Sequence, residues 1–220
     1  MTTRHTQQVT EFFDTNVAAY DAFYEPPSAL ARWFNRTFRK DVYRRRDMVI
    51  ELAQRFNCRT VLDVGCGSAR NSIWWLRHGI EFVHGVDISA EMIEEAHRLA
   101  REAGVADRCK FEVLDFMNWQ GAERFDLVAA CGVFDYVEKP TPFLAHMARF
   151  ANRVIYGSFP GWTLVRSPLR KIRYKLQGCP THFYREAEIR KIFGEVGFGR
   201  LDMRKNDSGR LVWAAKSGAD

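Results

Sequence analysis

The chain has 220 residues, of which 46% are hydrophobic, and this is enough to bury the core of a single domain. No run of about 18 apolar residues occurs, which argues against a membrane-spanning helix. The net charge of +6 is uneven, because residues 1–57 carry +2, residues 58–159 carry −3 and residues 160–220 carry +7. The basic last third favours an anionic substrate or surface.

The cysteines and histidines indicate neither a disulfide framework nor a metal site. The five cysteines are an odd number without a Cys-x-x-Cys pair, and the six histidines lack the spacing of zinc ligands. Residues 1–8 are polar and lack the apolar core of a signal peptide. We therefore expect a cytoplasmic protein with free thiols and no metal.

Apolar spacing predicts N-terminal helices followed by alternating strands and helices. Residues 6–23 are expected to form a helix or helix pair, which Pro26-Pro27 separates from a second helix running from Ser28 to Phe56. Ser89 is expected to cap the helix that follows it. Strands are expected at 59–64, 81–87, 109–114, 125–130 and 152–158, and helices at 69–78, 90–103 and 137–150.

The C-terminal part reads as an irregular stretch, a helix and a hairpin. The helix is expected from Arg185 to Val196, where Gly197 ends it. Strands 200–205 and 210–215 are joined by so short a turn that they must be antiparallel neighbours. The predicted fold class is α/β: a doubly wound, seven-stranded, mostly parallel sheet with the last strand antiparallel and with N-terminal helices.

Residues 61–69, Val-Leu-Asp-Val-Gly-Cys-Gly-Ser-Ala, indicate a nucleoside site between a strand and a helix. Gly65 and Gly67 allow the backbone to approach a ligand, and Asp87 ends the next strand, where it can accept hydrogen bonds from ribose hydroxyls. Arg70 stands at the third glycine of a dinucleotide pattern, and Asp63 would repel a phosphate. The acidic strand suits a ligand with an ammonium and a sulfonium, namely S-adenosylmethionine.

The chain resembles the class I S-adenosylmethionine-dependent methyltransferases over nearly its whole length. One departure is Ala69, where the family usually has a glycine, and alanine is small enough to keep the turn. The C-terminal part, with Cys179-Pro180-Thr181-His182-Phe183-Tyr184, a helix and Gly197-Phe198, resembles the small-molecule methyltransferases. Four stations match in order: Val61-Leu62-Asp63-Val64-Gly65-Cys66-Gly67, Gly85-Val86-Asp87-Ile88-Ser89, Leu114-Asp115-Phe116 and Phe125-Asp126-Leu127-Val128.

The resemblance implies a role for each cofactor-binding residue. The methionine part would lie along the glycine turn, the ribose on Asp87 and the adenine between Ile88, Asp115 and Phe116. Tyr20 would fold over the cofactor, or pack in the core, and Asp126 would support the strand edge. A basic cluster is expected to form an exposed helix face, or else one of its members would meet the cofactor carboxylate, with Arg46 as the candidate. The cluster consists of Arg36, Arg39, Lys40, Arg44, Arg45 and Arg46. The cofactor-binding residues are Asp63, Gly65, Cys66, Gly67, Asp87, Ile88, Asp115, Phe116, Cys131, Gly132 and Tyr20.

The segment 160–183 is the candidate for the acceptor site, since its basic and apolar residues alternate and it lacks acidic ones. Its arginines, Arg166, Arg170 and Arg173, could pair with a carboxylate or phosphate. A solvated basic loop and adhesion to an anionic membrane surface are alternatives. His182 is the candidate base, with a structural histidine as the alternative, and Tyr184 is a further catalytic candidate.

The predicted activity is methyl transfer from S-adenosylmethionine to a small acceptor that is anionic or aromatic, with oxygen as the methylated atom. The alternatives are an RNA methyltransferase, which the basic last third suggests, and a non-catalytic cofactor-binding protein. Nucleic acid is disfavoured, because Ala130-Cys131-Gly132-Val133 stands where an Asn-Pro-Pro-Tyr motif would follow the fourth strand. A single domain, 1–220, is expected, with a helical cap (1–57), a cofactor-binding core (58–159), a substrate lid (160–183) and a C-terminal helix and hairpin (184–220).

Overall fold

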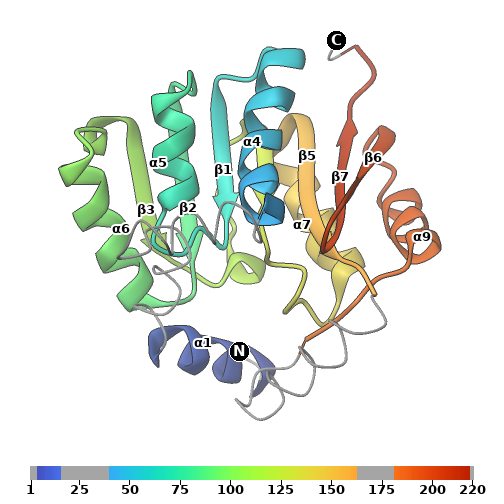
Figure 1. The fold of residues 1–220 in the computed structure, drawn as a ribbon, viewed down its shortest axis with the longest axis horizontal. Coiled ribbons are helices and arrows are strands. Elements are labelled where there is room, and N and C mark those ends of the chain that lie inside the picture. The colour runs from blue at the N-terminus through green and yellow to red at the C-terminus, as the bar shows by residue number, and fades with distance from the viewer. Residues whose placement is uncertain (1–3, 16–39, 163–180, 219–220) are drawn as a thin grey trace.

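One mixed sheet of seven strands forms the centre of the molecule in a computed structural model that describes residues 4–15, 40–162 and 181–218 (Figure 1). The strand order is β3-β2-β1-β4-β5-β7-β6, and β7 runs antiparallel to both of its neighbours, which confirms the predicted fold class. The strands are β1 (Thr60–Val64), β2 (Phe82–Asp87), β3 (Cys109–Val113), β4 (Phe125–Ala130), β5 (Ala151–Pro160), β6 (Arg200–Asn206) and β7 (Gly209–Ala215).

Helices cover both faces of the sheet (Figure 1). Helices α4, α5 and α6 bury their apolar residues against one face, and α7 and α9 bury theirs against the other. Because both faces are covered, the central strands β1 and β4 are buried except at Thr60 and Asp126, as is usual for parallel sheets. The helices are α1 (Arg4–Thr15), α4 (Lys40–Arg55), α5 (Arg70–Arg77), α6 (Ala90–Glu102), α7 (Pro140–Phe150) and α9 (Glu186–Val196).

The predicted elements agree closely with the structure wherever it is described. Ser89 caps α6 by accepting a hydrogen bond from Met92 N at 3.1 Å, and Gly197 ends α9 with a φ of 63°. The helix expected at 137–150 begins only at Pro140, because proline is suited to the first turn of a helix. Residues 16–39 of the two expected N-terminal helices lie outside the described residues, and two short 3-10 helices (Ala106–Arg108 and Phe116–Asn118) were not predicted.

The carboxyl ends of β1, β2 and β4 meet at one edge of the sheet, since these strands are parallel neighbours in register. Asp63 of β1 lies opposite both Gly85 of β2 and Ala129 of β4. Figure 1 shows α1 at this edge, where it packs against α6. Ligands of doubly wound sheets bind at this edge.

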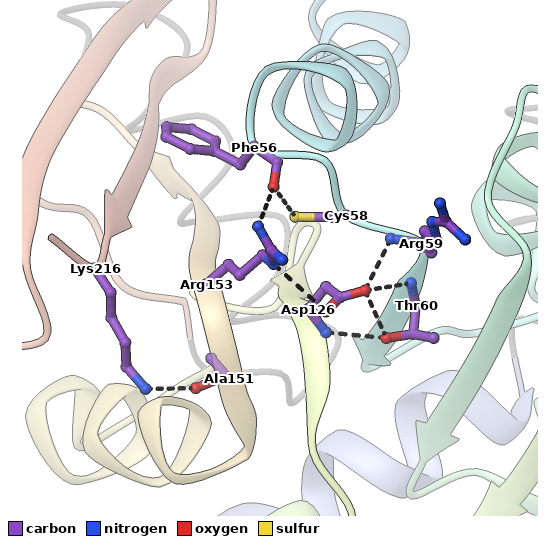
Figure 2. Close-up of polar contacts among 8 residues, drawn as sticks. All are labelled: Phe56, Cys58, Arg59, Thr60, Asp126, Ala151, Arg153 and Lys216. Atoms are coloured by element: carbon purple, nitrogen blue, oxygen red, sulfur yellow. Dashed lines mark hydrogen bonds and ion pairs between the residues drawn. The ribbon is translucent and has the colours of Figure 1, made fainter. Parts of the chain in front are cut away.

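Asp126 closes the opposite edge of the sheet, where β1 and β4 begin (Figure 2). Its carboxylate accepts hydrogen bonds from Arg59 N, Thr60 N and Thr60 Oγ1 at 2.9 to 3.2 Å. Arg153 and Lys216 donate to the carbonyls of Phe56 and Ala151, just past the ends of α4 and α7. A cavity of 410 Å³ opens among these groups, but its charged side chains are already engaged in holding the fold.

In the described ranges, no helix is both long enough and apolar enough to cross a membrane.

Candidate cofactor site

The turn after β1 is built from residues with left-handed backbone conformations. Gly65 and Gly67 have φ values of 70° and 53°. A Cβ atom on Gly65 would lie 2.5 Å from Cγ2 of Val133, so a side chain there would clash with the segment after β4. Ala69 is also left-handed, with a φ of 59°, and for an alanine this conformation costs about 1 kcal/mol. The turn is therefore kept in spite of the missing glycine.

Asp87 joins the end of β2 to this turn. Its carboxylate accepts hydrogen bonds from Gly67 N at 2.8 Å and from Ser89 N at 3.0 Å. Burial raises the pKa of Asp87, and these backbone donors oppose the shift. A second effect comes from Asp14 of α1, whose negative charge also raises this pKa, so α1 reaches the cofactor edge.

Asp63 lies deeper at the same edge and is only 1% exposed. Its carboxyl group accepts a hydrogen bond of 2.5 Å from Ser72 Oγ in the first turn of α5. Burial raises the pKa of Asp63 to about 7, although the bond from Ser72 lowers it and the charge of Asp87 raises it further. A cation placed near Asp63 and Asp87 would favour their ionised forms.

The candidate adenine residues follow β3. Asp115 accepts hydrogen bonds from Met117 N at 3.1 Å and Asn118 Nδ2 at 2.7 Å, so its carboxylate caps the short helix. Phe116 is buried, and its ring contacts those of Phe143 and His146 at centroid distances of 5.3 and 4.8 Å. Asp115 and Phe116 lie near the cofactor edge, and Ile88 is half-buried. The contacts of these three residues with adenine stay predictions.

The segment after β4 faces α4 and β5. Gly132 N donates to Ser158 Oγ at 2.7 Å, and Cys131 Sγ lies 3.9 Å from the carbonyl oxygen of Arg45. Burial raises the pKa of the Cys66 and Cys131 thiols, and the charge of Asp63 raises both further. Both thiols are therefore protonated structural groups near neutral pH.

The described residues on the two sides of 163–180 pair with one another beyond β5 and form a neck made of Gly161, Trp162, Phe183 and Tyr184. Gly161 forms an isolated bridge with Tyr184, Tyr184 N donates to Pro160 O at 2.9 Å, and the rings of Trp162 and Phe183 are 5.6 Å apart. His182 N donates to Asp135 O at 2.8 Å, which places His182 next to a buried aspartate. Arg166, Arg170, Arg173 and Tyr20 lie outside the described residues.

The side chain of Tyr184 forms a hydrogen bond within the neck. Its hydroxyl donates to Val137 O at 3.2 Å. Burial raises the pKa of Tyr184 well above its usual value, and the charges of Asp135 and Glu188 raise it further. Its hydroxyl is consequently a hydrogen-bond donor near neutral pH and cannot serve there as a base.

Several residues of this edge carry no motif and were missed by sequence reasoning. Ser72 supports Asp63, Ser158 supports Gly132, and Asn71 lies buried in the first turn of α5. For Asn71 and Ser72, the usable signal was that they open the helix after the glycine turn. Ser158 is brought in from the far end of β5 by strand pairing alone.

Residues 61–153 match a family model described as a methyltransferase domain. The magnesium protoporphyrin IX methyltransferase ChlM of Synechocystis PCC 6803, solved with bound SAH (S-adenosylhomocysteine), is 26% identical with a TM-score of 0.76, and the match covers 95% of this chain and 98% of that one. Methyltransferase GfsG of Streptomyces halstedii is 31% identical over 40% of this chain and 32% of that protein. A probable fatty acid methyltransferase of Pseudomonas putida is 29% identical over 35% and 20%, so these two matches span a third or less of the curated relatives.

The fold, the glycine turn and the domain match over residues 61–153 are those of class I S-adenosylmethionine-dependent methyltransferases, in agreement with the predicted resemblance. The structure fits the family's cofactor, S-adenosylmethionine. The buried carboxyl group of Asp63, the half-buried one of Asp87 and a turn without room for a side chain at Gly65 form a cradle that suits a cationic nucleoside better than a pyrophosphate.

Proposed function

We propose that this protein transfers a methyl group from S-adenosylmethionine to a small acceptor that is anionic or aromatic, and that the methylated atom is oxygen. One observation carries the proposal: Asp63 and Asp87 lie at the carboxyl ends of adjacent parallel strands, and both are tied to the turn and helix that follow β1. The small molecules named for two relatives, magnesium protoporphyrin IX and fatty acid, support an acceptor of this size.

When bound, S-adenosylmethionine supplies an electrophilic methyl group on a sulfonium. The task of the chain is to hold the acceptor in line with that methyl group and to keep water out, and such positioning can supply much of the rate. Asp87 would accept from the ribose hydroxyls, and Asp63 would lie toward the positive charges. Cys131 and Gly132 would support the methyl side through their backbone.

The acceptor would enter beside the neck formed by Trp162, Phe183 and Tyr184. His182 is the candidate that can take a proton from a phenol, whereas Tyr184, which stays protonated, would donate a hydrogen bond. An acceptor carboxylate would need no base. Arg166, Arg170 and Arg173 would pair with the acceptor's negative charge.

Methylation of RNA is the second candidate, favoured by the charge of +7 on residues 160–220. A third possibility is cofactor binding without turnover. One experiment separates the three. The purified protein is incubated with methyl-labelled S-adenosylmethionine and a metabolite extract, which is then split into small-molecule and RNA fractions. Label in the small-molecule fraction is expected; label in RNA alone, or binding without transfer, would contradict the proposal.

A further inference from the structure

The methionine end of the cofactor carries both an ammonium and a carboxylate, and the glycine turn alone provides no cation for the carboxylate. We propose that Arg45 and Asn71 hold this amino-acid end, and that Ser208 of the terminal hairpin positions Arg45. The inference rests on the proposed function for the identity of the cofactor. It assigns the two residues that distinguish S-adenosylmethionine from nucleosides without the amino acid.

Arg45 of α4 reaches the end of β4. A Cβ atom placed on Gly132 would lie 3.1 Å from Nη1 of Arg45, so the guanidinium stands directly over this glycine. Its side chain is only 15% exposed, and its Nη2 atom forms a salt bridge of 3.7 Å with the carboxylate of Asp41, whereas Nη1 is the atom that faces Gly132. The main chain of Arg45 is fixed as well, because its carbonyl oxygen accepts from the Tyr156 hydroxyl at 3.0 Å. A mostly buried guanidinium at this place suits a carboxylate, which it can bind through two parallel hydrogen bonds.

Arg46, the residue singled out from the sequence, is engaged elsewhere. Its guanidinium lies over the Trp74 ring at 3.9 Å and pairs with Asp47 at 3.1 Å. The stacking on Trp74 holds α4 against α5, and a hydrogen bond from Trp75 Nε1 to the carbonyl oxygen of Arg46 adds to this contact. The helical register thus turns Arg45, and not Arg46, toward the end of the sheet.

Asn71 supplies a polar group on the other side of the same corner. It is 9% exposed, and its Oδ1 atom is buried without a hydrogen-bond donor. Since it precedes Trp74 and Trp75 by three and four residues, it lies on the α5 face that meets α4, one turn nearer the glycine turn. A buried acceptor without a donor is costly, and an incoming ammonium would satisfy it.

The charges of this corner match a zwitterion. Asp63 lies opposite Ala129 in the strand pairing, and the Arg45 guanidinium stands over Gly132. The pKa of the Cys131 thiol, which burial raises, is raised further by the charge of Asp63 and lowered by that of Arg45. The end of β4 therefore lies between a carboxyl group and a guanidinium. An α-amino acid fits with its ammonium toward Asp63 and Asn71 and its carboxylate toward Arg45.

Ser208 fixes the guanidinium from the β6–β7 turn, 163 residues away in sequence. Its hydroxyl accepts a hydrogen bond of 3.0 Å from Arg45 Nη2. The turn is anchored to α4 by further contacts, namely Arg44 with Asp207 at 3.1 Å and Asn206 Nδ2 with Asp41 O at 3.2 Å. Ser208 is therefore a positioning residue, which acts through Arg45.

The test compares two ligands by calorimetry: S-adenosylhomocysteine, which has the amino acid, and 5′-methylthioadenosine, which lacks it. Arg45→Gln should weaken S-adenosylhomocysteine about 10- to 100-fold, and Asn71→Ala about ten-fold, with 5′-methylthioadenosine within about two-fold of the wild type. Ser208→Ala should give the same selectivity at about three-fold. Asn71→Ala should leave the thermal midpoint of the ligand-free protein unchanged.

Arg55→Gln is the matched control, since it removes the same charge from the exposed last turn of α4, next to Phe56 at the opposite edge of the sheet. It should leave both affinities unchanged. Equal weakening of both ligands by Arg45→Gln and Asn71→Ala would show a merely structural role, and unchanged binding of S-adenosylhomocysteine would overturn the proposal outright. The calorimetry needs no acceptor. The two affinities can therefore be compared even if the wild-type protein transfers no methyl group to any acceptor, so a failure of the proposed function is distinguished from a failure of this inference.

Discussion

Asp63 is a carboxyl group whose protonation connects the fold to the cofactor. Because burial raises its pKa to about 7, the folded state holds a proton there that the unfolded state releases near pH 4. The contribution of Asp63 to the free energy of unfolding therefore falls as the pH rises from about 4 to about 7. An ionised Asp63 is stabilised by a neighbouring ammonium, so binding of the cofactor displaces the proton below that pH.

We expect the affinity for S-adenosylmethionine to fall roughly ten-fold per pH unit below about 7 and to be level above it. Calorimetry in buffers of different ionisation enthalpy should show proton release at pH 6. Asp63→Asn keeps an oxygen for Ser72 and should flatten the profile. The neighbouring Asp87 also has a raised pKa, so a profile that is unchanged in Asp63→Asn would assign the titration to Asp87 instead.

Asp87 should be the most sensitive residue for cofactor binding. Asp87→Ala removes the ribose acceptor and the group that holds Gly67 N and Ser89 N, and we expect the loss of about 100-fold or more in affinity for S-adenosylhomocysteine. Calorimetry measures the affinity, and circular dichroism should show that the fold survives. Full affinity in this variant would defeat the assignment of the site.

At the scale of elements, the described residues that flank the candidate acceptor segment meet beyond the end of β5. The rings of Trp162 and Phe183 are in contact at a centroid distance of 5.6 Å. We expect the double variant Arg170→Glu and Arg173→Glu to raise the Michaelis constant for an anionic acceptor about ten-fold or more. Binding of S-adenosylhomocysteine should be unaffected. Unaltered steady-state kinetics would show that these arginines do not bind the acceptor.

At the scale of the whole molecule, the two edges of the sheet have different tasks: we expect one to bind the cofactor and the opposite one to stabilise the fold. Asp126 at the far edge holds the starts of β1 and β4 through three hydrogen bonds (Figure 2), and Asp126→Ala leaves those donors unpaired. We expect a loss of about 2–4 kcal/mol in the free energy of unfolding, measured with urea, and unchanged affinity for S-adenosylhomocysteine. A parallel loss of affinity would show that the two edges are coupled.

Local signals were sufficient for most of the fold and for part of the site. The strand and helix bounds follow from apolar periodicity, the cap at Ser89 and the glycine at 197, all of which act within a few residues. Gly65, Gly67 and Asp87 were predictable because they belong to a continuous strand, turn and strand. The 3-10 helices were missed because short turns of this kind carry little apolar periodicity.

The sequence by itself determined the succession of strands and helices along the chain, the glycine turn and the two carboxylates, since each depends on the local spacing of apolar, flexible and acidic residues. Tertiary structure decided which arginine of a basic run faces the site: the seating of α4 against Trp74 and Trp75 turns Arg45 inward and Arg46 away. It also brought Ser72, Ser158 and Ser208 to the polar groups they support. Packing of helices on the sheet and pairing of distant strands fix those contacts, and neither is encoded in a local pattern.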